Sequence, residues 1–135
     1  MNIAILSTYP SRECGIASFS SDLRDNLIRF NENVEILAIT DNNADYDYPT
    51  EVVFQISQDE RASFISAADF VNESSIDIVI IQHEYGIFGG PDGSYVLDFS
   101  RKLEKPFIVT THTVLSKPSP GQKQVLDELG NMAIG

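Results

Sequence analysis

The sequence predicts an α/β fold, a doubly wound parallel sheet of the Rossmann-like kind with helices on both faces. Segments typical of strands alternate with segments of helical periodicity along the whole chain. The strand segments are continuous apolar runs, which indicates strands buried on both faces of a parallel sheet. Crossovers between such strands are right-handed. The segments follow one another without an internal repeat or a low-complexity linker, so we expect one domain over residues 1–135, and we expect the strand order 3-2-1-4-5.

Five apolar segments are expected to form the strands. They are residues 2–8, 34–39, 52–56, 76–81 and 106–112. Residues 76–81 (IDIVII) form the most apolar of them. Residues 41–50 (DNNADYDYPT) separate the second strand from the third and have the Asn, Asp and Pro content of a loop.

Four segments are expected to be helical: residues 16–30, residues 59–72, a segment that starts after Asp92 or Ser94 and ends at Leu103, and residues 122–129. The first has apolar residues at spacings of three and four, namely Ile16, Phe19, Leu23, Leu27 and Phe30. The expected caps are Ser57 or Asp59 for the second helix, Asp92 or Ser94 for the third, and Ser119 followed by Pro120 for the last.

Composition and charge argue against several classes of function. The chain has 9 Lys and Arg against 20 Asp and Glu, a formal charge of −11, which argues against a nucleic-acid groove or an anionic membrane as partner. It has no apolar run near the roughly 18 to 20 residues of a transmembrane helix. No signal peptide is recognised, so a cytoplasmic location is expected. The single cysteine, Cys14, and two histidines make a poor metal set, and no bound metal is expected.

The predicted topology places the functional site beyond the carboxyl ends of the strands, where the strand order reverses between strands one and four. The loops to consider are residues 9–15 (YPSRECG), 83–93 (HEYGIFGGPDG) and 111–121 (THTVLSKPSPG). Both histidines, His83 and His112, stand at strand ends. Gly15 opens the first helix, whose N-terminus suits a phosphate. A purely structural role for each of these residues stays open at this point.

Established motifs for other chemistries are absent from the sequence. It contains neither G-x-G-x-x-G nor G-x-x-x-x-G-K-[ST], so the dinucleotide fingerprint and the P-loop are missing. His83-Glu84 does not belong to H-E-x-x-H, because Ile87 occupies the place of the second histidine. No serine lies in a G-x-S-x-G elbow.

Three segments together resemble a known family. They are ILSTYPSRECGIASFSSDL, FVNESSIDIVIIQHEYGIFGGPDGSYVLDF and KPFIVTTHTVLSKPSPGQKQVLDEL. They resemble the N-terminal half of family 4 glycosyltransferases, the retaining enzymes of GT-B fold, and most of all a mannosyltransferase-like bacterial group with QHE-[FY]-GIFGGPDG and T-x-HTVL. The resemblance covers essentially the whole chain, and residues 82–93 and 110–121 are its most specific parts.

The resemblance implies an enzyme that moves a sugar from a nucleotide-sugar to a hydroxyl acceptor without a cofactor. It implies two Rossmann-like lobes, of which the N-terminal lobe binds the acceptor and the C-terminal lobe binds most of the donor. The donor-binding E-x7-E segment of the family belongs to the C-terminal lobe. We therefore expect residues 1–135 to be the N-terminal lobe alone, to be inactive by themselves, and to expose a surface that could form a homodimer.

The same resemblance implies roles for individual residues. His112 would line the reaction centre as the catalytic histidine, and Gly15 and Ile16 would contact the donor diphosphate, although the usual glycine pair is Cys14-Gly15 here. The residues expected on the acceptor side are His83, Glu84, Tyr85, Gly86, Phe88, Gly89 and Thr113. Packing of the loop is the alternative role for Tyr85 and Phe88. Two other functions are weighed: a non-catalytic α/β binding module, and a flavodoxin-like electron carrier with residues 7–18 as its phosphate loop.

Overall fold

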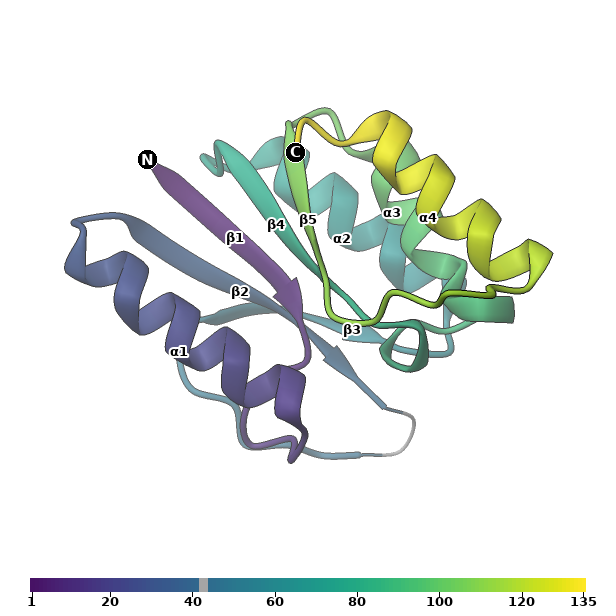
Figure 1. Cartoon of the computed structure of the whole chain (residues 1–135). Coiled ribbons are helices and arrows are strands. Elements are labelled where there is room, and N and C mark those ends of the chain that lie inside the picture. Colours follow the sequence, from purple (N-terminus) through teal and green to yellow (C-terminus); the bar gives the residue numbers. More distant parts are fainter. Residues whose placement is uncertain (42–43) are drawn as a thin grey trace.

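The computed structural model describes residues 1–41 and 44–135, so Asn42 and Asn43 of the predicted loop lie outside the described residues. Its centre is a five-stranded parallel sheet with the order β3-β2-β1-β4-β5, which confirms the predicted topology (Figure 1). The strands are β1 (Asn2–Ser7), β2 (Asn33–Thr40), β3 (Val52–Ser57), β4 (Ile78–His83) and β5 (Phe107–Thr111). The strand order reverses between β1 and β4.

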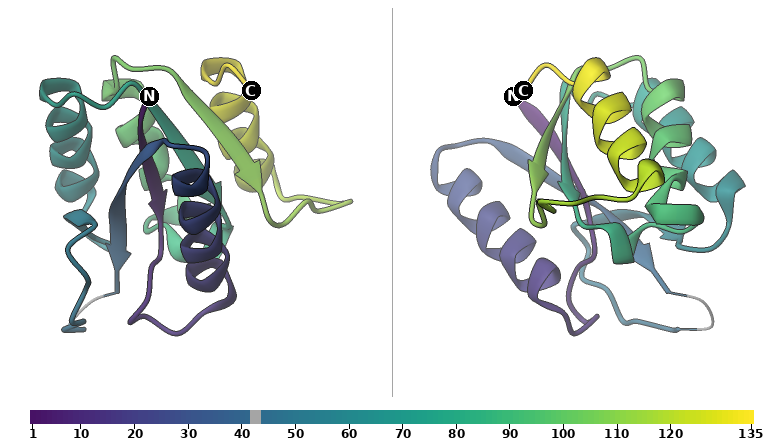
Figure 2. Two further views of the ribbon diagram at one scale, coloured as in Figure 1. Left: turned by 90° about the vertical axis from the view of Figure 1, so that its left-hand side faces the viewer. Right: turned by 45° about the vertical axis from the view of Figure 1, so that its right-hand side comes forward.

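Helices cover the two faces of the sheet unequally. The helix α1 (Gly15–Arg29) lies on one face, and α2 (Arg61–Glu73), α3 (Tyr95–Lys102) and α4 (Pro120–Met132) lie together on the other (Figure 2). We call the face of the sheet that α1 covers the α1 face, and the other face the opposite face. The described residues between β2 and β3 form no helix, as predicted, so the α1 face has a single covering helix and leaves Ile78 and Ile108 half-exposed.

Strand residues alternate between the two faces, because successive side chains of a strand point in opposite directions. Towards the α1 face lie the buried residues Ile3, Ile5, Val34, Ile36, Ala38 and Ile80. Towards the opposite face lie Ala4, Leu6, Leu37, Ile39, Val79 and Ile81, which pack on α2, α3 and α4. Every strand near the centre therefore has an apolar residue at nearly every position, which explains the continuous apolar runs of the sequence.

The ends of the elements differ from the prediction in several places. The strand β4 begins at Ile78 and extends through Gln82 to His83, because it pairs with β5 up to His83 and Thr111. The strand β1 ends at Ser7, one residue early. Residues 134–135 pair with the outer edge of β5, where Ile134 N–H donates to the Phe107 carbonyl at 2.9 Å.

The predicted caps meet different outcomes. Ser119 caps α4 as predicted, in a reciprocal capping box with Gln122 and with Pro120 in the first turn. The predicted caps of α2 are wrong, since Glu60 occupies its N-cap position without a side-chain hydrogen bond. Ser94 precedes α3 but makes no capping hydrogen bond, and Asp92 lies in a short 3-10 turn, η2 (Pro91–Gly93).

The predicted apolar face of α1 is only partly buried. Leu23 and Leu27 pack on the α1 face of the sheet, and Ile16 packs on the other core at the end of the sheet. Phe30 is exposed at the C-terminal end of the helix. Phe19 is 46% exposed, because it lies beside the end of β5 rather than beneath the sheet. This exposed aromatic ring becomes part of the candidate site.

No helix among the described residues is long and apolar enough to cross a membrane.

Candidate functional site

The structure places the two histidines on opposite faces of the sheet. His83 ends β4 on the side of Val79 and Ile81, and its ring contacts Phe88 of the opposite-face core. His112 follows β5, and its ring contacts Phe19 of α1. The backbone joins them, since His112 N–H donates to the His83 carbonyl at 2.9 Å. Two residues that are joined by a backbone hydrogen bond between neighbouring strands therefore have side chains in two different environments.

His112 forms a small cluster with Gln82 and Phe19, which we call the His112 cluster. Its Nε2 atom lies 2.6 Å from Oε1 of Gln82. The Phe19 ring meets the imidazole edge to face, with centroids 4.8 Å apart and planes at 82°. Gln82 is fully buried although it is polar. The cluster lies beside the reversal between β1 and β4, where a ligand of a doubly wound sheet is expected.

The first turn of α1 adjoins this cluster, because residues three and four apart share a helix face and Phe19 follows Gly15 and Ile16 at those spacings. Cys14 is the N-cap, and its Sγ accepts a hydrogen bond from Ala17 N–H at 3.3 Å. A Cβ built on Gly15 meets no atom within 4 Å. The N–H groups of Gly15 and Ile16 have no intrahelical acceptor, as is usual in the first turn of a helix.

His83 is enclosed by the loop that follows it. Its side chain is 0% exposed. The Tyr85 ring meets it edge to face at 4.8 Å, and the Phe88 ring stacks on it at 5.8 Å. Neither ring nitrogen has a hydrogen-bond partner among the described residues. A buried imidazole of this kind is kept neutral by its surroundings rather than presented to solvent.

The loop of residues 84–94 is held down by its own polar groups and glycines. The Glu84 carboxylate accepts from Gly86 N–H at 2.8 Å and caps the short turn η1 (Tyr85–Ile87). The Tyr85 hydroxyl donates to the Gln122 carbonyl of α4 at 3.3 Å. Gly89 packs so closely on the segment after β3 that an added Cβ would lie 1.8 Å from the Gln58 carbonyl oxygen. Gly89 is therefore required for close packing, whatever its part in binding.

Burial lowers the pKa of both imidazoles. Desolvation lowers the pKa of His83 from 6.5 to about 4, against a smaller opposing effect of the Glu84 carboxylate. Desolvation also lowers the pKa of His112, again opposed by Glu84. Both rings are therefore neutral at pH 7. A neutral imidazole offers one N–H donor and one nitrogen acceptor, which suits it to hydroxyl groups.

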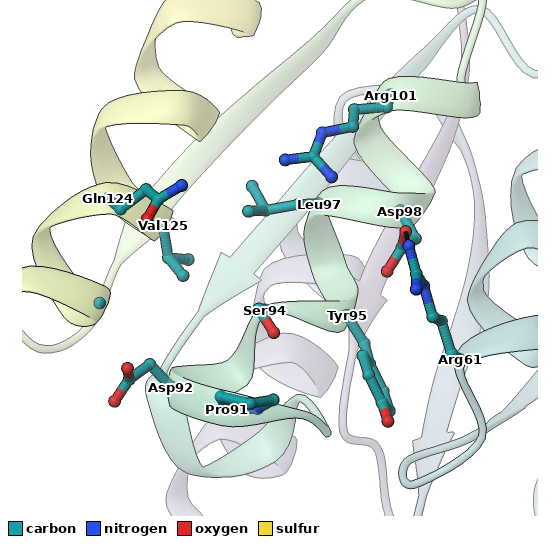
Figure 3. Close-up of a pocket in the computed structure, with 11 residues that line it drawn as sticks. Arg61, Pro91, Asp92, Ser94, Tyr95, Leu97, Asp98, Arg101, Gln124 and Val125 are labelled. Atoms are coloured by element: carbon teal, nitrogen blue, oxygen red, sulfur yellow. Dashed lines mark hydrogen bonds and ion pairs between the residues drawn. The ribbon is translucent and has the colours of Figure 1, made fainter.

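A separate cavity of about 370 Å³ lies on the opposite face, behind the same loop (Figure 3). It is lined by the first residue of α2, by η2 and α3, and by the N-terminal half of α4. Its arginines are already paired: Arg61 with Asp98 at 2.8 Å, and Arg101 with Glu128. Asp92 lies against Gly121 in the first turn of α4, where the helix dipole favours a carboxylate. The charged groups that line the cavity are therefore already paired with groups of the chain itself. None of the described residues that line it is a predicted site residue.

The structure thus brings together only part of the predicted site. His112 and Phe19 meet on the α1 face, and Thr113 follows in a half-buried position. The first turn of α1, with Gly15 and Ile16, lies at the end of the sheet, where the Ile16 side chain packs on the other core. His83, Phe88 and Gly89 are buried on the opposite side, and Glu84, Tyr85 and Gly86 form the rim of the loop between them. Sequence reasoning did not single out Gln82, and it recognised Phe19 only as part of the apolar face of the first helix. Within residues 1–41 and 44–135, no group of three or more His, Cys, Asp or Glu side chains is arranged to hold a metal ion.

Comparison with known proteins supports the fold. The sequence matches no family model and no curated protein. Among solved structures, the chain is similar to an alpha-glucosyltransferase in complex with UDP and a 13-mer DNA containing a central A:G mismatch. The superposition has a TM-score of 0.63 at 18% sequence identity, and covers 99% of this chain but 36% of that one. The chain therefore has a Rossmann-type α/β fold similar to that of GT-B glycosyltransferases.

Proposed function

We propose that this chain is the N-terminal, acceptor-side domain of a retaining family 4 glycosyltransferase of the mannosyltransferase-like group. The full enzyme would move a sugar from a nucleotide-sugar to a hydroxyl acceptor. One observation supports this most: a neutral histidine, His112, contacts Phe19 near the start of α1, at the carboxyl end of a sheet whose fold resembles that of a glucosyltransferase solved with UDP. The His112 side chain and the α1 N-terminus are the two groups that the proposed chemistry needs.

The α1 N-terminus is proposed to contact the donor diphosphate. Negative charge grows on the diphosphate as the bond to the sugar breaks. The N–H groups of Gly15 and Ile16 lie at the positive end of the α1 dipole and can donate to that charge in the transition state. Gly15 has no side chain that could hinder a diphosphate near these N–H groups, and a Cβ built on it meets no atom within 4 Å. Because the charge is met by backbone N–H groups, no resident metal or cofactor is proposed.

His112 is proposed to contact hydroxyl groups of the transferred sugar. Its half-buried ring has a lowered pKa, so it stays neutral while positive charge develops on the sugar. A neutral ring can hydrogen-bond a hydroxyl without adding charge repulsion to an oxocarbenium-like centre. Thr113 would extend the same wall. Phe19 packs edge to face on the ring beside this wall.

The loop after β4 is proposed to form the acceptor wall. Glu84 and Tyr85 lie at its half-buried rim, where Glu84 could accept from an acceptor hydroxyl once it releases Gly86 N–H. His83 and Phe88 are buried, so we assign them to the support of that rim. Gly86 and Gly89 shape its turns.

A second lobe is part of this proposal. The solved glucosyltransferase is larger, and the chain spans 36% of its length. We propose that the donor nucleotide-sugar is bound mainly by such a lobe and that residues 1–135 form the acceptor domain. The DNA of that structure is not transferred to this proposal, because a net charge of −11 disfavours a nucleic-acid acceptor. Exposed Phe19 and Val114, which the second lobe would cover, would favour a homodimer of the isolated chain, testable by sedimentation.

The proposal is tested by transfer assays on a protein in which residues 1–135 are joined to a donor-binding lobe. His112→Ala should lower kcat/KM by about 100-fold or more, about 2.7 kcal/mol, in a variant that remains folded. Ser116→Ala in the same exposed loop is the matched control and should keep full activity. A His112→Ala variant that transfers sugar normally, or sugar transfer by residues 1–135 alone, would contradict the proposal.

A further inference from the structure

We propose that Gln82 is a positioning residue that holds His112 in the tautomer with hydrogen on Nε2, so that Nδ1 is the atom offered to a substrate hydroxyl. The tautomer assignment rests on geometry alone. Its consequence for catalysis rests on the function proposed above.

The backbone fixes the two side chains next to each other. Gln82 pairs with Thr110 and His83 with Thr111 across β4 and β5. The ladder extends by one more hydrogen bond, from His112 N–H to the His83 carbonyl. Since Gln82 and His112 both point to the α1 face, the glutamine amide comes directly against the imidazole, with Oε1 2.6 Å from Nε2.

The surroundings leave the pair little freedom. Gln82 is 0% exposed, so its amide cannot turn into solvent. Phe19 packs against the other side of the imidazole through its edge-to-face contact. A polar residue enclosed at this depth normally has a hydrogen-bonding task. Here the Oε1 atom has the ring nitrogen of His112 as its partner, whereas the Nε2 atom of the same amide is buried without a partner among the described residues.

The chemistry of the contact determines the tautomer. A carbonyl oxygen can only accept, so Nε2 must carry the hydrogen when it faces Oε1. A neutral imidazole has one such hydrogen, which leaves Nδ1 with a free electron pair. The Nδ1 atom makes no hydrogen bond within the described residues and is not among their buried atoms without a partner, so it is accessible to solvent. It can therefore accept a hydrogen bond from a sugar hydroxyl while Nε2 is occupied.

Gln82 of β4 and Phe19 of α1 contact this ring, and the Glu84 carboxylate and the His83 imidazole lie further from it. Glu84 favours the charged imidazolium, whereas burial disfavours it more strongly. Glutamine is a neutral acceptor and leaves this balance unchanged. A glutamate at the same place would add a carboxylate beside Nε2, and its charge should raise the pKa of His112.

The tautomer can be read directly by long-range ¹H–¹⁵N correlation spectra of the histidine rings in the 135-residue chain. The two histidines are assigned with His112→Ala and His83→Leu. We expect the Nε2 nitrogen of His112 to show the shift of a protonated ring nitrogen and Nδ1 that of an unprotonated one. A dominant Nδ1–H form would mean that the glutamine amide is reversed and would overturn the proposal.

Variants sharpen this experiment. Gln82→Met should give His112 a mixture of tautomers, whereas Gln55→Met, the same change at an exposed site of β3, should leave the spectrum unchanged. Gln82→Glu should keep the Nε2–H form and raise the pKa of His112 by about 1 unit or more. If Gln82→Met leaves the tautomer as it is, Gln82 does not set it.

A catalytic readout separates this proposal from the one on which it rests. In the protein with a donor-binding lobe, Gln82→Met should lower kcat by roughly tenfold and change its pH profile, and Gln82→Glu should restore part of the rate. Unchanged kcat in Gln82→Met, with His112→Ala inactive, would overturn the positioning role alone. The expected tautomer together with a fully active His112→Ala variant would overturn the proposed function and leave the tautomer assignment intact.

Discussion

The two histidines stand at the ends of neighbouring strands of one sheet, yet their side chains lie on opposite faces of that sheet. His112 is half-buried on the α1 face, bonded to Gln82 and in contact with an exposed phenylalanine. His83 is fully buried on the opposite face between Tyr85 and Phe88, with no hydrogen-bond partner among the described residues. The comparison teaches that position at a strand end is insufficient to define a site residue. The face to which the side chain points decides whether the ring is enclosed, as in His83, or partly accessible, as in His112.

The difference also separates two uses of an imidazole. The His112 ring is held by a directional hydrogen bond and keeps one nitrogen open. The His83 ring fills space like an aromatic side chain, and its polar atoms are a cost to the folded state. His112 should therefore matter mainly for activity and His83 mainly for stability. The following predictions would break or sharpen this contrast.

The largest effect on stability is expected for His83→Ala. Removal of a fully buried ring between two aromatic side chains leaves a cavity and should lower the free energy of unfolding by about 2–4 kcal/mol. His83→Leu fills most of the space without unpartnered nitrogens and should stay within about 1 kcal/mol of the wild type or exceed it. Urea denaturation of the 135-residue chain measures both. If His83→Leu is as damaging as His83→Ala, the ring nitrogens have partners and the contrast fails.

The next effect is a loss of stability in mild acid. The pKa of His83 is about 4 in the folded chain and 6.5 ordinarily, so the unfolded chain binds a proton first as the pH falls. Stability should therefore be complete above pH 6.5 and decrease by about 2–3 kcal/mol as the pH falls towards 4.

Other groups titrate in the same range, so the difference between two curves isolates His83. The free energy of unfolding of His83→Leu, measured over the same pH range, should lack this part of the decrease. The lowered pKa of His112 acts in the same direction and remains in both curves. Parallel curves for the wild type and His83→Leu would show that His83 does not cause the loss.

A third prediction compares two glycines of the two regions. Gly89→Ala should lower the free energy of unfolding by about 1–3 kcal/mol, because the added Cβ would overlap the Gln58 carbonyl and displace the loop over His83. Gly15→Ala should change it by about 0.5 kcal/mol or less, because the Cβ has no neighbour within 4 Å. Thermal denaturation of the two variants provides the test. A destabilised Gly15→Ala would show that the α1 N-terminus is packed rather than open.

Much of the fold was predictable from the sequence, because alternating strands and helices of ordinary length leave few topologies. The buried face of α2 and the Ser119-Pro120 start of α4 were also predictable, because both depend only on residues within or next to the helix. The exposure of Phe19 was not predictable, since helical spacing identifies an apolar stripe but not how far the sheet extends beneath it.

The strand ends that carry the candidate residues were predictable, but the directions of their side chains were not. A strand with apolar residues on both faces, such as residues 76–81, contains no visible alternation, so the faces of Gln82 and His83 could not be assigned. The register with β5 supplies that information, because it extends β4 to His83 and sets Gln82 beside His112. Gln82 did leave one signal in the sequence, as the first polar residue after that apolar run.

The central claim is that ligands meet this chain at the α1 face, at the His112 cluster and the first turn of α1. The most direct test is an NMR titration of the ¹⁵N-labelled 135-residue chain with UDP, with inorganic pyrophosphate in parallel. The account predicts that the amide signals of Gly15 and Ile16 and the ring signals of His112 move, while the ring signals of His83 stay in place. Shifts confined to His83, Gly89 or the cavity lined by Arg61 and Asp98 would contradict it.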